Sequence, residues 1–91
     1  MVKKFRTKPV EILAIKFDGF NYDEVNKFTE NQFFEVDESD RGDDPDIIAE
    51  VLDVLHSTWI GVKAGQWIIQ GQKGEFYPCD PETFDWKYEE A

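Results

Sequence analysis

The chain has 91 residues, a net charge of −10 and a single cysteine. A chain of this length corresponds to one domain, and its negative charge argues against nonspecific binding to nucleic-acid backbone, which needs a cationic surface. The lone Cys79 excludes an internal disulfide and is typical of proteins in a reducing cytoplasm.

No apolar stretch approaches the ~20 residues that span a bilayer, and none follows the basic residues near the start, as a signal peptide requires. We therefore expect a soluble domain over residues 1–91, frayed over residues 1–5. Aromatic residues make up 15% of the chain. They supply enough apolar surface for a core at this size and leave room for a homo-oligomer.

The first predicted elements are a strand and a helix. In residues 10–17 apolar side chains fall on both faces of an extended segment, which predicts a central or nearly central strand. A turn at residues 18–20 leads to a helix over residues 21–30. Asn21 is predicted to be its N-cap, and Glu24, three residues later, to complete a capping box.

The middle of the chain combines a short strand, an acidic loop and an ambiguous segment. Residues 32–36 are predicted to form the strand, and residues 37–46 a loop that stays solvated because its charges repel one another. Residues 47–55 fit two patterns. Their apolar residues recur at helical spacing, with Asp44 as an N-cap and Pro45 at the first position, and they also alternate as in a strand.

The last third is predicted to consist mainly of short strands. The pattern predicts strands over residues 58–62, 67–70 and 75–77, a hairpin turn over 71–74 and an amphipathic strand over 84–89. Pro78 is predicted to end the third of these strands, and Asp80 and Pro81 to begin a single helical turn at residues 80–84. The expected fold is α+β: a small single domain with a mostly antiparallel sheet of about five or six strands and one packed helix.

The acidic loop matches a calcium-binding EF-hand only in part. Counted from Asp37, Gly42 falls at the sixth position, as that motif requires. The fifth and twelfth positions, which need oxygen ligands, hold Arg41 and Ile48. We therefore expect no metal site and no cofactor, and interpret the loop as a solvated acidic surface.

Catalytic residues are scarce. His56 is the only histidine and is followed by Ser57, but neighbours on a strand or turn point in different directions. Cys79 has no evident base, and the adjacent Asp80 disfavours a thiolate. We therefore predict that the protein is not an enzyme.

Basic and aromatic residues are the candidates for a ligand site. Lys73 and the backbone N–H groups of the Gly-rich turn could hold a phosphate, although a hairpin turn with a solvated lysine is the simpler interpretation. An aromatic ring at a rim could stack on a nucleobase, although each ring taken alone is typical of a core. The candidate ligand-binding residues are Arg6, Lys8, His56, Thr58, Trp59, Trp67, Lys73 and Tyr77.

Three motifs stand out: Phe5-Arg6-x-Lys8-Pro9-Val10-Glu11, Leu55-His56-x-Thr58-Trp59 and Gly71-x-Lys73-Gly74-Glu75-Phe76-Tyr77-Pro78-Cys79-x-Pro81-x-x-Phe84. Together, over residues 5–90, they resemble a family of short phage and prophage proteins with a Pro-Gly-Asp-Tyr-Ile or Pro-Gly-Asp-Trp-Ile signature. The chain departs from that family in its longer acidic loop and in having Ala64-Gly65-Gln66 for Pro-Gly-Asp, so that its turn relies on Gly65. The resemblance favours a strand over residues 49–54.

The resemblance brings no established activity but implies a phage or prophage gene expressed in the host cytoplasm. We expect a non-enzymatic counter-defence protein that sequesters a ligand, such as a nucleotide immune signal. The alternatives are a minor virion or assembly component, or an acidic decoy that imitates nucleic acid and binds a host or defence protein. The acidic face of such a decoy would consist of Asp37, Asp40, Asp43, Asp44 and Asp46.

Overall fold

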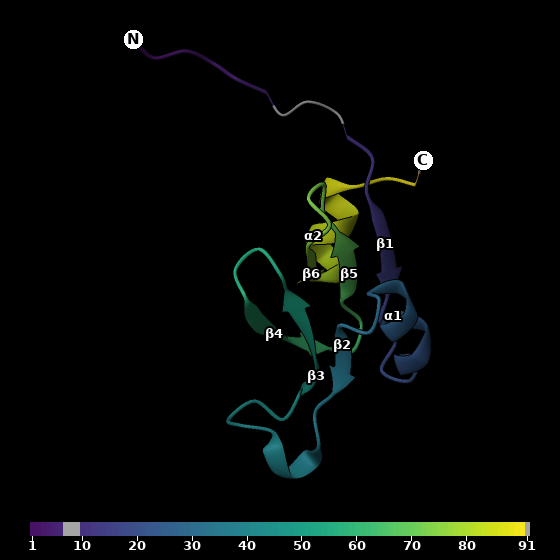
Figure 1. The fold of residues 1–91 in the computed structure, drawn as a ribbon. Helices are drawn as coiled ribbons and strands as arrows, with labels where there is room; N and C mark the ends of the chain where they lie inside the picture. The colour runs from purple at the N-terminus through teal and green to yellow at the C-terminus, as the bar shows by residue number, and fades with distance from the viewer. Residues whose placement is uncertain (7–9, 91) are drawn as a thin grey trace.

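The computed structural model describes residues 1–6 and 10–90 (Figure 1). The elements follow one another as β1 (Leu13–Lys16), α1 (Tyr22–Phe28), β2 (Phe33–Glu35), the 3-10 helix η1 (Glu38–Asp40), β3 (Ile47–Asp53), β4 (Thr58–Lys63), β5 (Trp67–Gln70), β6 (Phe76–Cys79) and α2 (Pro81–Lys87). The strands form two antiparallel three-stranded sheets, ordered β1-β5-β6 and β2-β3-β4. This confirms the α+β class and the number of strands, although the strands divide into two sheets instead of forming one.

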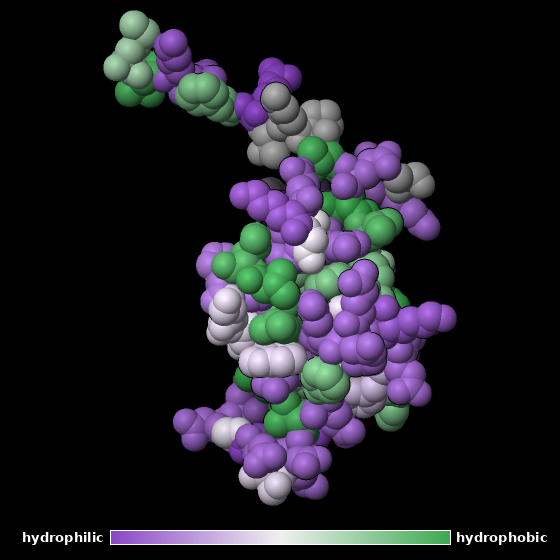
Figure 2. All heavy atoms as spheres, viewed as in Figure 1, coloured by the Kyte–Doolittle hydropathy of each residue, from purple (hydrophilic) through white to green (hydrophobic). Residues whose placement is uncertain are grey.

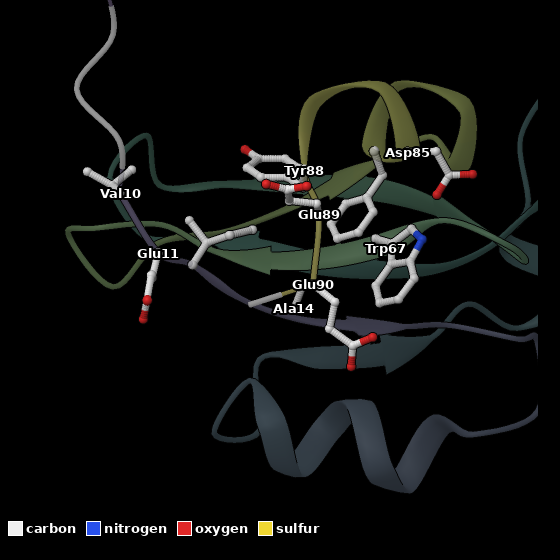
Figure 3. Close-up of a pocket in the computed structure, with 10 residues that line it drawn as sticks. Val10, Glu11, Ala14, Trp67, Asp85, Tyr88, Glu89 and Glu90 are labelled. Carbon is white, nitrogen blue, oxygen red and sulfur yellow. The ribbon is translucent and has the colours of Figure 1, made fainter.

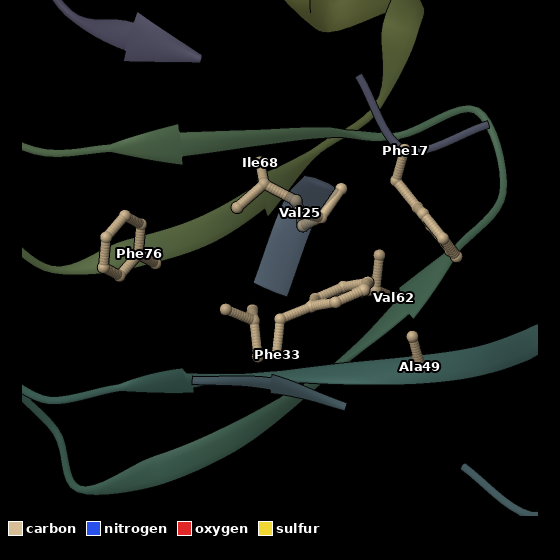
Figure 4. Packing of buried hydrophobic residues seen from close by; sticks show 8 residues of the cluster. Phe17, Val25, Phe33, Ala49, Val62, Ile68 and Phe76 are labelled. Carbon is tan, nitrogen blue, oxygen red and sulfur yellow. The ribbon is translucent and has the colours of Figure 1, made fainter. Parts of the chain in front are cut away.

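The hydrophobic core lies between the two sheets (Figure 4). Ile68 of β5 and Phe76 of β6 point toward the second sheet, and the rings of Phe17 and Phe33 meet edge to face with centroids 5.1 Å apart. The buried cluster consists of Phe17, Val25, Phe33, Ala49, Val51, Val62, Ile68 and Phe76. Each buried aromatic ring removes about 150–250 Å² from water, so a small cluster is enough to hold the sheets together.

Strand alternation gives the sheet β1-β5-β6 a second apolar face. Successive side chains of a strand point to opposite sides, and β5 places Ile68 in the core between the sheets. Its neighbours Trp67 and Ile69 therefore lie on the opposite side, where Ile69 is fully buried outside the core cluster. This outer face of the sheet is the one that helix α2 covers.

Helix α1 begins at the predicted place but without the predicted capping box. The Oδ1 atom of Asn21 accepts the backbone N–H of Asp18 at 2.9 Å, and its Nδ2 donates to the Glu24 carboxylate at 3.0 Å. The turn before the helix therefore takes the oxygen that would otherwise cap the first helical N–H groups. Toward the other end, Nδ2 of Asn26 donates to the carbonyl of Phe33 at 2.6 Å and ties α1 to β2.

Strand β1 lies at a sheet edge, so the prediction of a central or nearly central strand over residues 10–17 is wrong. In the described part of the chain β1 pairs only with β5, from Leu13 opposite Gln70 to Lys16 opposite Trp67. Its two apolar faces reflect layers above and below the sheet, since Ile15 packs against the core and Ala14 faces the α2 side. Apolar residues on both faces do not require strands on both sides.

The ambiguous segment after the acidic loop is a strand. β3 occupies the centre of the second sheet, pairs with β2 and β4, and has a register shift between Ile47 and Ala49. The strand alternative is therefore confirmed. The predicted strands at residues 32–36, 58–62 and 67–70 are also present.

The prediction of a strand end at Pro78 is wrong. β6 continues through this residue to Cys79, with Pro78 opposite Ile68. An edge strand tolerates proline because its missing N–H need not belong to the ladder, and β6 lies at the edge of its sheet.

The predicted strand over residues 84–89 is also wrong, because the helical turn expected at residues 80–84 continues as α2 to Lys87. Asp80 and Pro81 occupy the N-cap and first helical positions, as predicted, and Lys87 lies in the last turn, where a cation suits the helix dipole. The alternating aromatic residues fit this helix because Phe84 and Tyr88, four residues apart, share one side of it, while Trp86 is exposed.

Two segments project from the body (Figure 1). Residues 1–6, hereafter the arm, extend away from the sheets and are all exposed. The acidic loop contains η1 and is fastened to β4 where Oδ2 of Asp44 lies 3.0 Å from Nζ of Lys63. Within residues 1–6 and 10–90, none of the helices has the length and apolar character needed to cross a membrane.

Candidate functional site

Helix α2 turns the outer face of the sheet β1-β5-β6 into a grooved surface. Phe84 stacks on Trp67 of β5 with ring centroids 4.2 Å apart and planes 7° apart, and Tyr88 packs against Phe84 at 5.1 Å. Phe84 and Tyr88 are four residues apart and so lie on one side of the helix. Trp86, between them, is 85% exposed.

The larger hollow, hereafter the aromatic groove, lies between this helix and the segment leading into β1 (Figure 3). Its volume is about 470 Å³, and its lining residues are Val10, Glu11, Ile12, Ala14, Trp67, Phe84, Asp85, Tyr88, Glu89 and Glu90. Four of these residues are carboxylates, and none of those that the structure describes is basic. The groove therefore combines an apolar, aromatic surface with a strongly negative potential.

A second hollow, hereafter the hairpin groove, adjoins the first and has a volume of about 370 Å³. It is lined by Val10, Ile12, Leu55, Gly71, Gln72, Lys73, Glu75, Tyr77 and Tyr88. Val10, Ile12 and Tyr88 belong to both grooves, so the two form one continuous surface. Lys73 and Glu75 balance one another in formal charge at the hairpin end.

Tyr77 of the hairpin groove is a neutral hydrogen-bonding group. Burial, followed by hydrogen bonding to Tyr88, raises the pKa of Tyr77 to about 12. Burial also raises the pKa of the nearby Cys79 thiol, with a further contribution from Asp80, so that the thiol stays protonated at neutral pH. Neither group supplies a nucleophile to the grooves.

The structure brings only part of the predicted ligand-binding set together. Trp67 lines the aromatic groove, and Lys73 and Tyr77 line the hairpin groove. Arg6 lies in the exposed arm, and Lys8 lies outside the described residues.

The other predicted ligand-binding residues, His56, Thr58 and Trp59, lie away from the aromatic groove on the turn between β3 and β4 and on β4 itself. Trp59 is 45% exposed and packs against Phe34 of β2, with ring centroids 5.7 Å apart. This pair lies on the second sheet and does not contribute to either groove.

His56 is held by a carboxylate that the sequence analysis did not single out. Its Nδ1 lies 2.7 Å from Oδ2 of Asp53, and Oδ1 of Asp53 accepts the backbone N–H groups of Leu55 and His56 at 3.0 and 3.3 Å. Hydrogen bonding to His56 lowers the pKa of Asp53. The arrangement closes the turn, in agreement with a structural role for this histidine.

The predicted acidic face lies on the projecting loop. Its exposed members are Asp37, Asp40, Asp43 and Asp46. Asp44 differs from them because its hydrogen bond to Lys63 lowers its pKa and ties it to β4. Within residues 1–6 and 10–90 there is no group of three or more His, Cys, Asp or Glu side chains that could hold a metal ion.

Sequence reasoning missed most of the lining of the aromatic groove. The missed residues are Val10, Glu11, Ile12, Ala14, Phe84, Asp85, Tyr88, Glu89 and Glu90. They come from the segment around the start of β1 and from α2 with the residues that follow it, and they meet because a helix through residue 87 directs Phe84 and Tyr88 at the sheet. The start signal at Asp80-Pro81 was the available clue.

Comparisons of the chain with protein-family models, with curated proteins and with solved structures found no match in any of the three.

Proposed function

We propose that the protein is a non-enzymatic phage or prophage accessory protein of the host cytoplasm that acts by binding. Its binding site is the continuous surface formed by the aromatic and hairpin grooves. The ligand that suits this surface best is an extended polypeptide segment in which basic and apolar side chains alternate, supplied by a partner protein.

The chemistry of the aromatic groove supports this function. The stacked rings of Trp67 and Phe84 give the groove an apolar, aromatic wall. Glu11, Asp85 and Glu89 also line the groove (Figure 3). Apolar side chains gain by leaving water, and carboxylates at an interface rim attract cations and speed their encounter with the site. A segment that carries both kinds of group uses both properties.

The geometry also bears on the nucleotide ligand expected from the sequence. Lys73 is the only basic residue among the described residues of either groove, and the carboxylates of the aromatic groove repel phosphate. Capture of a nucleotide stays a prediction that depends on the hairpin end of the surface. The cationic polypeptide is favoured because it uses the larger groove.

The test compares three short synthetic peptides by calorimetric titration: alternating lysine and phenylalanine, alternating lysine and serine, and alternating glutamate and phenylalanine. Only the first combines both features, and we expect only the first to bind tightly. Binding should weaken with added salt because the rim charges are solvent-accessible. Equal binding of all three peptides, or of none, contradicts the proposal.

A matched pair of charge-reversal variants locates the site. E89K/E90K changes the rim of the aromatic groove, whereas D40K/D43K makes the same charge change on the exposed acidic loop. We expect E89K/E90K to weaken binding of the lysine–phenylalanine peptide by roughly tenfold or more, and D40K/D43K to leave it nearly unchanged. The same assay with a panel of mononucleotides tests the hairpin end of the surface. If a nucleotide binds there, Lys73→Ala should weaken its binding.

The projecting acidic loop favours a second function, that of a decoy for a nucleic-acid-binding protein. Asp37, Asp40 and Asp43 are exposed on a segment at the far end of the molecule from α2 (Figure 1). For this function the two variants should exchange roles: D40K/D43K should abolish capture of a defined DNA-binding partner, and E89K/E90K should not.

A further inference from the structure

The arm combines the two features that the aromatic groove accommodates. Lys3, Lys4 and Arg6 supply positive charge, while Val2 is 99% exposed and Phe5 90% exposed. Figure 2 shows green apolar and purple charged side chains side by side along this segment. Apolar side chains of this size gain free energy when a complementary surface covers them.

The arm does not occupy the groove of its own chain. It leads away from the body (Figure 1), although Val10, four residues beyond Arg6, already lines both grooves. An extended chain spans about 3.3–3.6 Å per residue, so the six residues of the arm span roughly 20 Å. The arm is thus placed to meet another molecule that presents a complementary surface.

We propose that the arm of each chain docks in the aromatic groove of a second copy, so that two chains exchange arms around a twofold axis. Phe5 lies in this arrangement on the Trp67–Phe84 surface of the partner copy, and the arm's cations face Glu89 and Glu90 there. This inference rests on the proposed function, because it names the copy's own arm as a basic and apolar segment that the groove binds.

Charge complementarity and symmetry both favour a second copy. The arm carries three cations among its described residues and the groove four carboxylates, which is notable in a chain whose net charge is −10. A twofold arrangement uses every arm and every groove, so each dimer contains the same contact twice. Reciprocal docking buries Phe5 and Val2 of both chains.

The test is sedimentation equilibrium of the full chain at low and at high salt. We expect a dimer that weakens as salt is added, and a dissociation constant that rises about tenfold or more in Phe5→Ala. Thr83→Ala, an exposed change on α2 outside both groove linings, is the control and should leave the dimer unchanged. A monomer at all concentrations overturns the proposal.

Two charge-reversal variants give a sharper test. K3E/K4E makes the arm acidic, and E89K/E90K makes basic the part of the rim that faces the arm's cations, while Glu11 and Asp85 of the groove stay acidic. Each variant alone should be monomeric because its arm and this part of the rim then carry like charges. Mixing the two makes both arm–groove pairs complementary again and should restore a dimer containing one chain of each. Dimers that survive in either variant alone, or a mixture that stays monomeric, contradict arm exchange.

The inference and the proposed function fail in different ways. If the wild-type chain is monomeric but its groove still binds the alternating lysine–phenylalanine peptide, arm exchange is wrong and the binding function stands. If the chain is a dimer that neither variant disturbs, another surface forms it, and arm exchange is again wrong. If neither the free peptide nor the arm binds, both proposals are wrong.

Discussion

The indole of Trp67 and the ring of Phe84 stack almost parallel, with centroids 4.2 Å apart and planes 7° apart. This contact joins β5 to α2 and fixes the helix over the outer face of its sheet. The groove between α2 and the segment before β1 exists because of this placement. One aromatic pair therefore links the packing of the domain to its proposed binding surface.

Phe84→Ala should loosen α2 and remove the surface on which an apolar side chain rests. We expect a loss of about 1–3 kcal/mol in the free energy of unfolding, less than for a fully buried phenylalanine because Phe84 is only partly buried. Denaturant unfolding followed by circular dichroism measures it. The exposed neighbour in Thr83→Ala should change stability little, and an equal loss in both variants would contradict the role of the stack.

Phe33 and Phe34 are neighbours on β2 that point to opposite faces, which offers an internal comparison. Phe33 is 1% exposed within the core between the sheets, and Phe34 is 48% exposed against Trp59. Phe33→Ala should cost about 3–5 kcal/mol in the free energy of unfolding, and Phe34→Ala only about 1 kcal/mol. Denaturant unfolding measures both losses. A larger loss for Phe34→Ala than for Phe33→Ala would contradict the placement of the core on the Phe33 face of β2.

Acid should weaken the fold through Asp53. Its pKa is lower in the folded protein than the ordinary value of 3.8, chiefly because of the hydrogen bond to His56. The ionised carboxylate therefore stabilises the fold fully above that ordinary value, and this stabilisation is lost as the pH falls through the folded pKa. Asp53→Asn should flatten this part of a stability–pH profile, whereas Asp43→Asn, in the exposed loop, should leave its shape intact.

Gly65 meets a backbone requirement that other residues meet poorly. Its φ is +92°, its N–H donates to the carbonyl of Phe17 at 2.7 Å, and it connects β4 to β5. Gly65→Ala should cost about 1 kcal/mol or more. Gly42→Ala is the control, because an added Cβ there meets no atom within 4 Å and the backbone does not have positive φ. Thermal unfolding of the two variants should separate them clearly.

The sequence pattern predicted the elements that depend on local alternation. Residues 67–70 form β5 as expected. The turn before β5 was predicted to rely on Gly65, and the positive φ of Gly65 agrees with that prediction. Gln66, which stands where the resembling signature has Asp, makes two hydrogen bonds at the turn. Oε1 of Gln66 accepts the N–H of Lys63 at 2.8 Å, and its Nε2 donates to Asp80 at 2.8 Å.

The elements that depend on docking escaped prediction. Phe84, Trp86 and Tyr88 alternate as in an amphipathic strand. The start signal at Asp80-Pro81 predicts only that a helix begins there, and the packing of Phe84 on Trp67 accompanies its continuation to Lys87. Apolar residues on both faces of β1 could not reveal whether strands or a helix cover them. The groove residues were missed for the same reason, since they converge only after α2 folds over the sheet.

The most direct measurement of groove binding uses the three tryptophans as internal probes. The full chain carrying K3E/K4E, whose arm cannot compete, is titrated with the peptide of residues 1–6 while the indole N–H resonances are followed by NMR. The account predicts a saturable shift of the Trp67 resonance, with the Trp59 resonance on the second sheet unmoved. An unmoved Trp67, or equal shifts of all three indoles, would contradict it.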